Sequence, residues 1–396
     1  MTDQKKTGAK LAMVSFIVLC ICLMVPNYAQ YQVSPMGTQI IAQYGLELSQ
    51  LSSLFTAPMI PAIFFSLIGG LLIDKFGFKG VIGVGMVLTA AGCVWRLFSG
   101  SYLPLFLATL LTGFSACFIN AGSGKIIGSL FGAAAVPAKM GILMAASTAG
   151  MTIANLTTAY FPTIDAAFTV SAVFAVVCAV LWFLFVRSPK QQEAAAEAPE
   201  AGPGMGECLK VAMKSGSVWI VAFTLFFIMA ANVVIGSFLP TALSTRGVSE
   251  TTAGTIAAFY TVGNLLGCFA APAAIKALNS QKKVLLLFAI LAAAGVAFAW
   301  QIPSTALLAV AMLLTGTFLG GLIPVLMGLP VQFAAIGPVY AGTAGGVIST
   351  VQIFGAVLVP SYVLTPIAGD NFVVLYLLGG ACVLIAGVLS QFVRDI

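Results

Sequence analysis

Histidine is absent from this chain, and charged residues of any kind are scarce. Only 7% of the 396 residues are charged. Without histidine, the chain can have no His-ligated metal site, no Ser–His or Cys–His catalytic pair and no histidine proton relay. What is present is apolar: 60% of the residues are hydrophobic, and the mean hydropathy of +1.09 is far above that of a soluble domain. This composition indicates a polytopic membrane protein.

Acidic side chains are missing from the middle of every long hydrophobic run. Glu47, Asp165, Glu250 and Asp370 all fall between runs. Because a proton-coupled transporter usually relies on a buried carboxylate, proton coupling through such a residue is not expected. With no paired acids or metal-ligand cluster at membrane depth, we expect neither an enzyme nor a cofactor or metal. Seven of the eight cysteines lie in hydrophobic runs and are expected to be small buried residues, not disulfide partners.

Twelve hydrophobic runs are long enough to cross a bilayer, which takes about 20 helical residues. They cover residues 11–34, 50–72, 80–100, 103–127, 139–161, 166–187, 217–240, 252–275, 283–301, 304–328, 341–363 and 371–393. If the N-terminus is cytoplasmic, fifteen of the seventeen Lys and Arg residues lie on the inner side, and only Arg96 and Arg246 lie near the outer side. The positive-inside rule therefore predicts a multi-pass protein of the cytoplasmic (inner) membrane with both termini in the cytoplasm. Because the positive charges flank the spans, the net charge of +6 points to the lipid bilayer and not to nucleic acid.

A polar segment between the sixth and seventh runs divides the chain. Residues 188–216 are rich in Gln, Glu, Ala, Pro and Gly, as a linker would be. We expect an N-terminal bundle of six helices at 1–187, a cytoplasmic linker at 188–216 and a C-terminal bundle of six helices at 217–396. The second part of the linker, residues 207–214, could form a short interfacial helix. The two halves also resemble each other, since Asn27 and Asn232 occupy equivalent positions in the first and seventh runs.

The densest group of charges lies between the second and third runs. Residues 70–79 read GLLIDKFGFK. This segment resembles the loop between helices 2 and 3 of the major facilitator superfamily, roughly G-x-L-x-D-[RK]-x-G-[RK]-[RK]. The resemblance implies an all-α membrane protein with twelve transmembrane helices in two pseudo-symmetric six-helix bundles around a central cavity, and a monomer. It also implies that five residues of the loop act in gating: Gly70, Asp74, Lys75, Gly77 and Lys79.

Finer resemblances concern the substrate. The stretch from Asn120 and Lys125 to Lys139 is similar to the cyanate/nitrate-type and oxalate/monocarboxylate-type anion porters. The arginine that nitrate and cyanate porters carry in the first span has no counterpart here, because Gln30 and Gln32 occupy that region. The fifth run also lacks the Gly-Pro motif of many drug–proton antiporters. These comparisons favour a small organic anion other than nitrate and weaken the case for drug efflux.

Polar side chains recur inside the first, seventh and eighth runs. In lipid, an uncompensated polar group is costly, so these side chains must face protein or a water-filled cavity. Helical spacing places those of the first run on one face. We expect the following residues to bind substrate by hydrogen bonds: Asn27, Gln30, Tyr31, Asn232, Tyr260 and Asn264. The alternative for each is an ordinary hydrogen bond between helices.

Two cations lie closest to membrane depth. Arg96 is near the outer end of the third run, and Lys125 is near the inner end of the fourth. Either could supply the counter-charge for an anion. The alternatives are that Arg96 snorkels to the membrane surface and that Lys125 only anchors topology. We therefore predict secondary transport of a small organic solute, an anion such as a carboxylate, by exchange or facilitated flux. A porter for neutral or amphipathic solutes, including drug-like efflux, and a non-transporting sensor are the alternatives.

Overall fold

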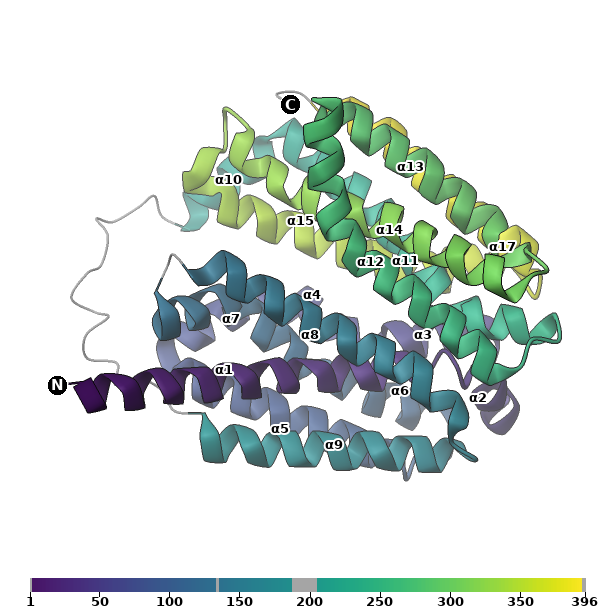
Figure 1. Ribbon diagram of the computed structural model, residues 1–396, viewed down its shortest axis with the longest axis horizontal. Helices are drawn as coiled ribbons and strands as arrows, with labels where there is room; N and C mark the ends of the chain where they lie inside the picture. Colours follow the sequence, from purple (N-terminus) through teal and green to yellow (C-terminus); the bar gives the residue numbers. More distant parts are fainter. Residues whose placement is uncertain (1, 133–134, 187–204, 394–396) are drawn as a thin grey trace. The chain divides into compact units, whose positions relative to one another are not determined.

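The computed structural model describes residues 2–132, 135–186 and 205–393, which form helices joined by short connections (Figure 1). No strand occurs among these residues. The helices of the first half are α1 (Thr2–Tyr31), α2 (Gly37–Tyr44), α3 (Leu48–Thr56), α4 (Ile60–Phe76), α5 (Phe78–Arg96), α6 (Tyr102–Leu111), α7 (Phe114–Phe131), α8 (Val136–Thr157) and α9 (Ile164–Phe185). Those that follow are α10 (Met205–Lys214), α11 (Gly216–Thr245), α12 (Glu250–Leu278), α13 (Gln281–Phe298), α14 (Thr305–Gly328), α15 (Gly337–Val359), α16 (Thr365–Ala368) and α17 (Phe372–Gln391). Short turns complete the chain: η1 (Ala57–Met59), η3 (Thr158–Tyr160), η4 (Ala299–Gln301), η5 (Leu329–Gln332) and η6 (Pro360–Leu364).

Membrane-spanning segments account for most of this helical content. Within the described residues, 12 helical segments are long and apolar enough to cross a membrane. The all-α, twelve-span architecture predicted from the sequence is thereby confirmed. α10 forms the short helix expected in the second part of the linker. Residues 187–204, the first part of that linker, lie outside the described residues.

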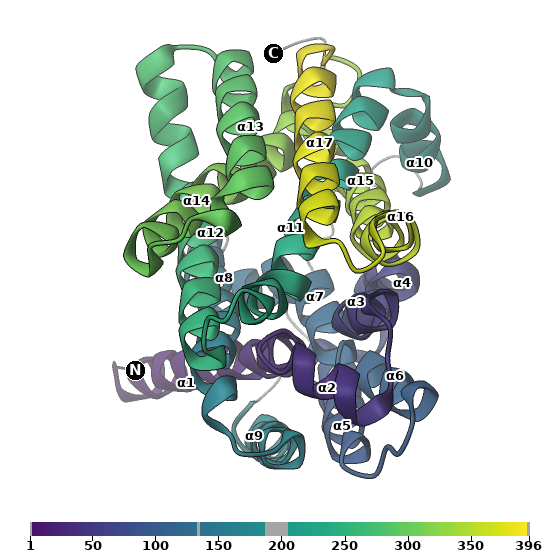
Figure 2. The same ribbon diagram turned by 90° about the vertical axis from the view of Figure 1, so that its right-hand side faces the viewer.

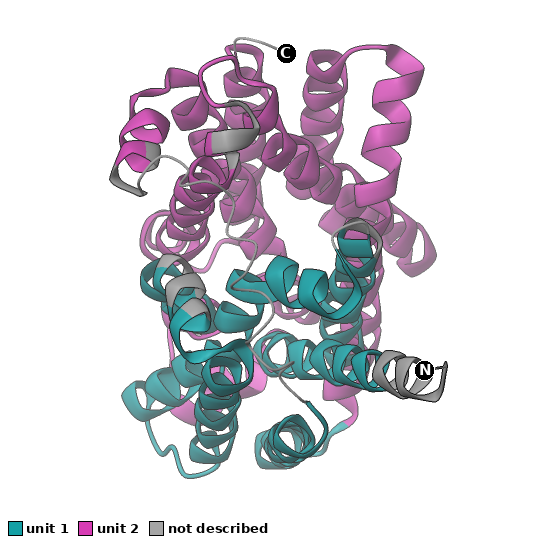
Figure 3. Cartoon of the chain, turned by 90° about the vertical axis from the view of Figure 1, so that its left-hand side faces the viewer, with its two compact units in different colours: residues 1–32, 57–154, 161–198 teal, residues 33–56, 155–160, 199–396 magenta. Residues whose placement is uncertain are grey.

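The helices group into two compact units (Figure 3). Unit 1 comprises residues 1–32, 57–154 and 161–198, and unit 2 comprises residues 33–56, 155–160 and 199–396. Two segments of the first half of the chain, 33–56 and 155–160, therefore cluster with the second half. The division into bundles at 1–187 and 217–396 stays a prediction from the linker and the repeat.

Two predicted spans are interrupted, and the interruptions, both within unit 1, pack against each other. The second span passes from α3 through η1 to α4, and the fourth passes from α6 to α7 at residues 112 and 113. Gly113 lies directly against the carbonyl group of Pro58, where any side chain would collide. Since proline also lacks an N–H group, both helices break where their backbones meet.

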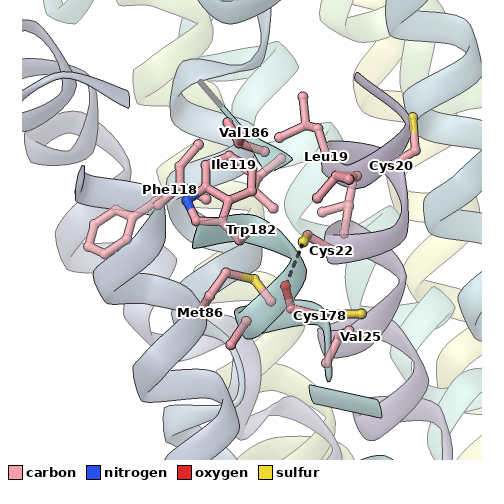
Figure 4. Packing of buried hydrophobic residues seen from close by; sticks show 14 of the residues in the cluster. Leu19, Cys20, Cys22, Val25, Met86, Phe118, Ile119, Cys178, Trp182 and Val186 are labelled. Carbon is pink, nitrogen blue, oxygen red and sulfur yellow. Dashed lines mark hydrogen bonds between the residues drawn. The ribbon is translucent and has the colours of Figure 1, made fainter. Parts of the chain in front are cut away.

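The core of unit 1 is built from α1, α5, α7 and α9 (Figure 4). Trp182 of α9 is fully buried, and its Nε1 donates to the Lys79 carbonyl at 3.0 Å. The Cys22 thiol donates to the Cys178 carbonyl at 3.7 Å, which joins α1 to α9. Of the seven cysteines whose side chains are described, all are free thiols and six are buried. Cys268 is exposed, so for this residue the expectation of burial was wrong.

In unit 2, α12 and α14 are in extensive contact (Figure 2). Gly263 and Gly267 of α12 face the backbone of α14, while Gly316 and Gly320 of α14 face the backbone of α12. Such small-xxx-small pairs let helix backbones approach closely in lipid, where van der Waals packing replaces the hydrophobic effect as the driving force. The crossing fixes the position of the polar residues that α12 carries.

Candidate functional site

Polar residues of α11 and α12 meet inside unit 2. Asn232 of α11 donates from Nδ2 to Oδ1 of Asn264 at 3.2 Å. Asn264 in turn donates from Nδ2 to the Tyr260 carbonyl one turn earlier in α12, also at 3.2 Å. Tyr260 itself is only 1% exposed. The structure thus brings together the three residues of the second half that the sequence predicts to bind substrate.

Asn264 is held in place by α14. A methyl group on Gly320 would lie 2.5 Å from both the Cα and the carbonyl oxygen of Asn264, and 2.7 Å from its Oδ1. The absence of a side chain at Gly320 therefore allows Asn264 to point its carboxamide at Asn232. Gly320 is not among the site residues predicted from the sequence. Its spacing of four residues from Gly316 is the small-xxx-small pattern that favours close helix packing, and this signal could have identified it.

Three polar residues of α1, namely Asn27, Gln30 and Tyr31, point in other directions than two neighbouring side chains that hydrogen-bond to the backbone of α9. The side chains of Cys22 and Gln32 contact α9, because their hydrogen bonds go to the carbonyl groups of Cys178 and Ala167. At about 100° per residue, Asn27 points away from both of these contacts, while Gln30 and Tyr31 lie about 80–180° around the helix from Cys22 and Gln32. All three side chains are nonetheless buried and do not face lipid. This is the arrangement that the sequence predicts for a binding face.

The two asparagines share one feature. Asn27 donates from Nδ2 to the Leu23 carbonyl of its own helix at 2.8 Å, just as Asn232 donates to Asn264. Among the described residues, neither Asn27 nor Asn232 receives a hydrogen bond on its Oδ1. Each side chain is thus oriented by its nitrogen and offers its oxygen as an acceptor.

Arg96 is enclosed within unit 1. The side chain is 1% exposed, and its guanidinium lies over the ring of Phe168 in α9, 3.8 Å from the centroid. Nη1 donates to the Ala29 carbonyl at 3.2 Å. Ala29 lies in the last turn of α1, so the cation stabilises the negative end of that helix. The alternative that Arg96 snorkels to the membrane surface is wrong, because the guanidinium packs between two helices.

Lys125 has the opposite environment. Its side chain is exposed on α7. An exposed ammonium keeps its hydration, so it exerts a weaker field on a bound anion than a buried guanidinium does. Of the two candidate counter-charges, Arg96 is the one that the structure places inside packed protein.

The loop between the second and third spans is attached to α9. Gly77 ends α4 with a φ of 78°, a conformation that favours glycine. Lys79 donates from Nζ to the Phe183 carbonyl at 3.3 Å, close to the C-terminal end of α9. Lys75 is exposed and lies 5.3 Å from the ring centroid of Phe76. The surroundings of Gly70 and the side chain of Asp74 lie outside what the structure describes. A gating role for the five residues stays a prediction.

Solved structures of other transporters share this fold. The chain is similar to the crystal structure of the nucleoside transporter NupG, with a TM-score of 0.77 and 14% identity over 95% of this chain and 100% of that one. It is also similar to the D-xylose-proton symporter, with a TM-score of 0.75 and 17% identity over 97% of this chain and 98% of that one. A bacterial homologue of the human lysosomal transporter Spinster matches with a TM-score of 0.73 and 15% identity, over 97% of this chain and 95% of that one. At these identities the likeness concerns the fold alone.

Sequence comparison adds a relative and a family. The hexuronate transporter of Bacillus subtilis (strain 168) is 26% identical over 209 residues, which cover 49% of this chain and 47% of that protein. The chain therefore matches about half the length of this curated relative. The profile of the Major Facilitator Superfamily matches residues 12–360, which is most of the chain. This protein belongs to the major facilitator superfamily, whose members are membrane transporters and not enzymes.

Proposed function

We propose that this secondary transporter moves a small hydroxylated organic anion, such as a sugar acid, by alternating access. The observation that carries the proposal is the shared state of Asn27 and Asn232. Each is oriented by its amide nitrogen and offers an amide oxygen that no described residue occupies. An accepting oxygen suits a ligand hydroxyl group, which donates. Each unit thus offers an acceptor that suits a hydroxylated substrate.

The negative charge of the proposed substrate is argued from Arg96. Its guanidinium contacts the carbonyl group of Ala29, in the same turns of α1 that carry Asn27, Gln30 and Tyr31. The side chains of those residues project from other faces of a helix that is about 10 Å across, so a substrate bound to them would lie about 10 Å from the guanidinium. At that distance, with an effective dielectric constant of about 20, a unit positive charge attracts a carboxylate by about 1.7 kcal/mol. This attraction corresponds to roughly a tenfold to twentyfold preference for an anion over a neutral analogue.

The similarity to a hexuronate transporter supports the same class of substrate. A hexuronate combines a carboxylate with several hydroxyl groups, the two features argued above from Arg96 and from the asparagines. Gln30 and Tyr31 in unit 1, and Asn264 and Tyr260 in unit 2, would add further hydrogen bonds. Lys125, which is exposed on α7, is the second candidate for the counter-charge.

Thermal stabilisation of the purified protein tests this proposal. A ligand that binds the folded state raises the apparent melting temperature. Glucuronate should raise it, whereas glucuronamide, which has the same hydroxyl groups without the charge, should have a much smaller effect. Equal shifts from glucuronamide and glucuronate would contradict the role of charge. Melting shifts from neutral or amphipathic compounds alone would favour a porter for such solutes. Ligand binding without flux in a transport assay would favour a sensor.

A further inference from the structure

A carboxylate joins α2 to the start of α12 within unit 2. Glu250 is the first residue of α12, and its Oε2 accepts a hydrogen bond from Gln39 Nε2 at 2.8 Å. Its Oε1 accepts from Thr38 Oγ1 at 3.2 Å. Hydrogen bonds to an ionised group are stronger than those between neutral groups. Glu250 thus uses both oxygens to hold another helix that is more than two hundred residues away in sequence.

The other acids on the predicted outer side do not make such a link. Glu47 accepts from Ser49, two residues away in the same segment. The carboxylates of Asp165 and Asp370 are exposed and accept no hydrogen bond from any residue that the structure describes. The contact of Glu250 with α2 is therefore specific and does not simply reflect a loop rich in acids.

The same helix α2 also contacts α11, at a buried hydroxyl group. Ser237 and Thr241 lie one turn apart on α11, and Ser34 lies in the turn before α2. Their hydroxyl oxygens are buried and have no hydrogen-bond partner among the described residues. Gly37, the first residue of α2, lies directly against the Thr241 hydroxyl. A contact that never opened would be expected to be apolar, because a buried polar group without a partner is costly.

In water, these hydroxyl groups would be hydrated. The contact between α2 and α11 is therefore suited to two states, one in which the two surfaces touch and one in which they separate. The segment that carries α2 links the first span to the second, yet it clusters with the second half of the chain. Some interaction must favour the closed contact against the cost of its unpartnered hydroxyl groups.

We propose that Glu250, Thr38 and Gln39 form a clamp that holds residues 33–56 against α12 and releases them when the predicted outer side opens during transport. Glu250 is here a positioning residue and does not contact the substrate. The competing explanation is local: an acid in the first turn of α12 also stabilises its own helix. The inference uses membership in the transporter family but not the identity of the substrate, so it can fail or succeed independently of the sugar-acid proposal.

The test measures access to Thr241 without any substrate. Thr241→Cys is placed in a full-length background with Cys208→Ser and Cys268→Ser, in sealed vesicles, and its reaction with a membrane-impermeant maleimide is timed. Glu250→Ala and Gln39→Ala should each speed the reaction about tenfold, the factor that corresponds to about 1.4 kcal/mol. Asp370→Ala, which alters an exposed outer acid with no partner among the described residues, should leave the rate unchanged.

An exchange of the two partners separates the clamp from the local explanation. Glu250→Gln combined with Gln39→Glu restores a carboxylate–amide pair but removes the acid from α12. The clamp predicts that this double variant reacts nearly as slowly as the parent, while each single change reacts faster. If Gln39→Ala leaves the rate unchanged, or if the double variant is as fast as Glu250→Ala, the clamp is refuted. Gln39→Ala keeps the test decisive even if changes at Glu250 impair folding.

Discussion

The crossing of α12 with α14 offers a sharp test of how the site in unit 2 is built. In Gly320→Ala, the new methyl group would lie 2.5 Å from the Cα and carbonyl oxygen of Asn264, whereas ordinary contact begins at 3.4 Å. The helices must therefore move apart by roughly 0.9 Å at this point. Overpacking of this kind costs about 1–3 kcal/mol, while the better helix propensity of alanine returns up to about 1 kcal/mol. We expect a net loss of about 1–2 kcal/mol.

This loss should be visible in the melting temperature of the purified protein. For a unit of this size, 1 kcal/mol corresponds to about 2–4 °C, so Gly320→Ala should melt about 2–8 °C lower than the parent. Gly345→Ala in α15 is the matched control, because no atom lies within 4 Å of the position that its methyl group would take. This control should be as stable as the parent or slightly more stable. If the two variants melt at the same temperature, the glycine contact does not hold α12 and α14 together.

Three further substitutions test the contacts of single side chains. Arg96→Lys keeps the positive charge and should keep the preference for glucuronate over glucuronamide in ligand-induced melting shifts. Arg96→Met should lower the affinity for glucuronate roughly tenfold to twentyfold and leave the affinity for glucuronamide unchanged. An unchanged preference in Arg96→Met would exclude Arg96 as the source of the charge effect. Trp182→Phe removes the hydrogen bond to the Lys79 carbonyl and should lower the free energy of unfolding by about 1 kcal/mol. Lys79→Ala should cost less, because the Lys79 ammonium group is partly hydrated in the parent protein. The reverse order would contradict this ranking. Asn232→Ala should reduce the glucuronate and glucuronamide shifts alike, because it removes a hydroxyl acceptor and no charge; selective loss of the glucuronate shift would refute that role.

The number and approximate limits of the spans were predictable because a run of about 20 apolar residues is a strong local signal. Breaks inside the spans were not predictable in the same way. The change from α6 to α7 depends on contact between Gly113 and Pro58, which belong to different spans. Hydropathy reports how long a segment is, but it says nothing about where two segments meet.

The candidate site shows the same limit. Periodicity identified Asn27, Asn232 and Asn264 as polar residues that must avoid lipid, but it could not show that Asn264 contacts Asn232. For Arg96, sequence position indicated only a depth along the helix, and that depth is compatible with snorkelling as well as with burial. Its burial depends on Phe168 in α9, which is far away in the chain. Partners of this kind become visible only when the helices are packed.

The proposed transport of a hydroxylated organic anion is tested most directly by counterflow in proteoliposomes. Vesicles that contain the purified protein are loaded with unlabelled glucuronate, and the entry of external radiolabelled glucuronate is followed. We expect transient, saturable accumulation of label that other sugar acids inhibit and that glucuronamide inhibits weakly; protein-free vesicles should show none. Absence of counterflow for every hydroxylated carboxylate tested, together with counterflow of neutral or amphipathic solutes, would contradict the account.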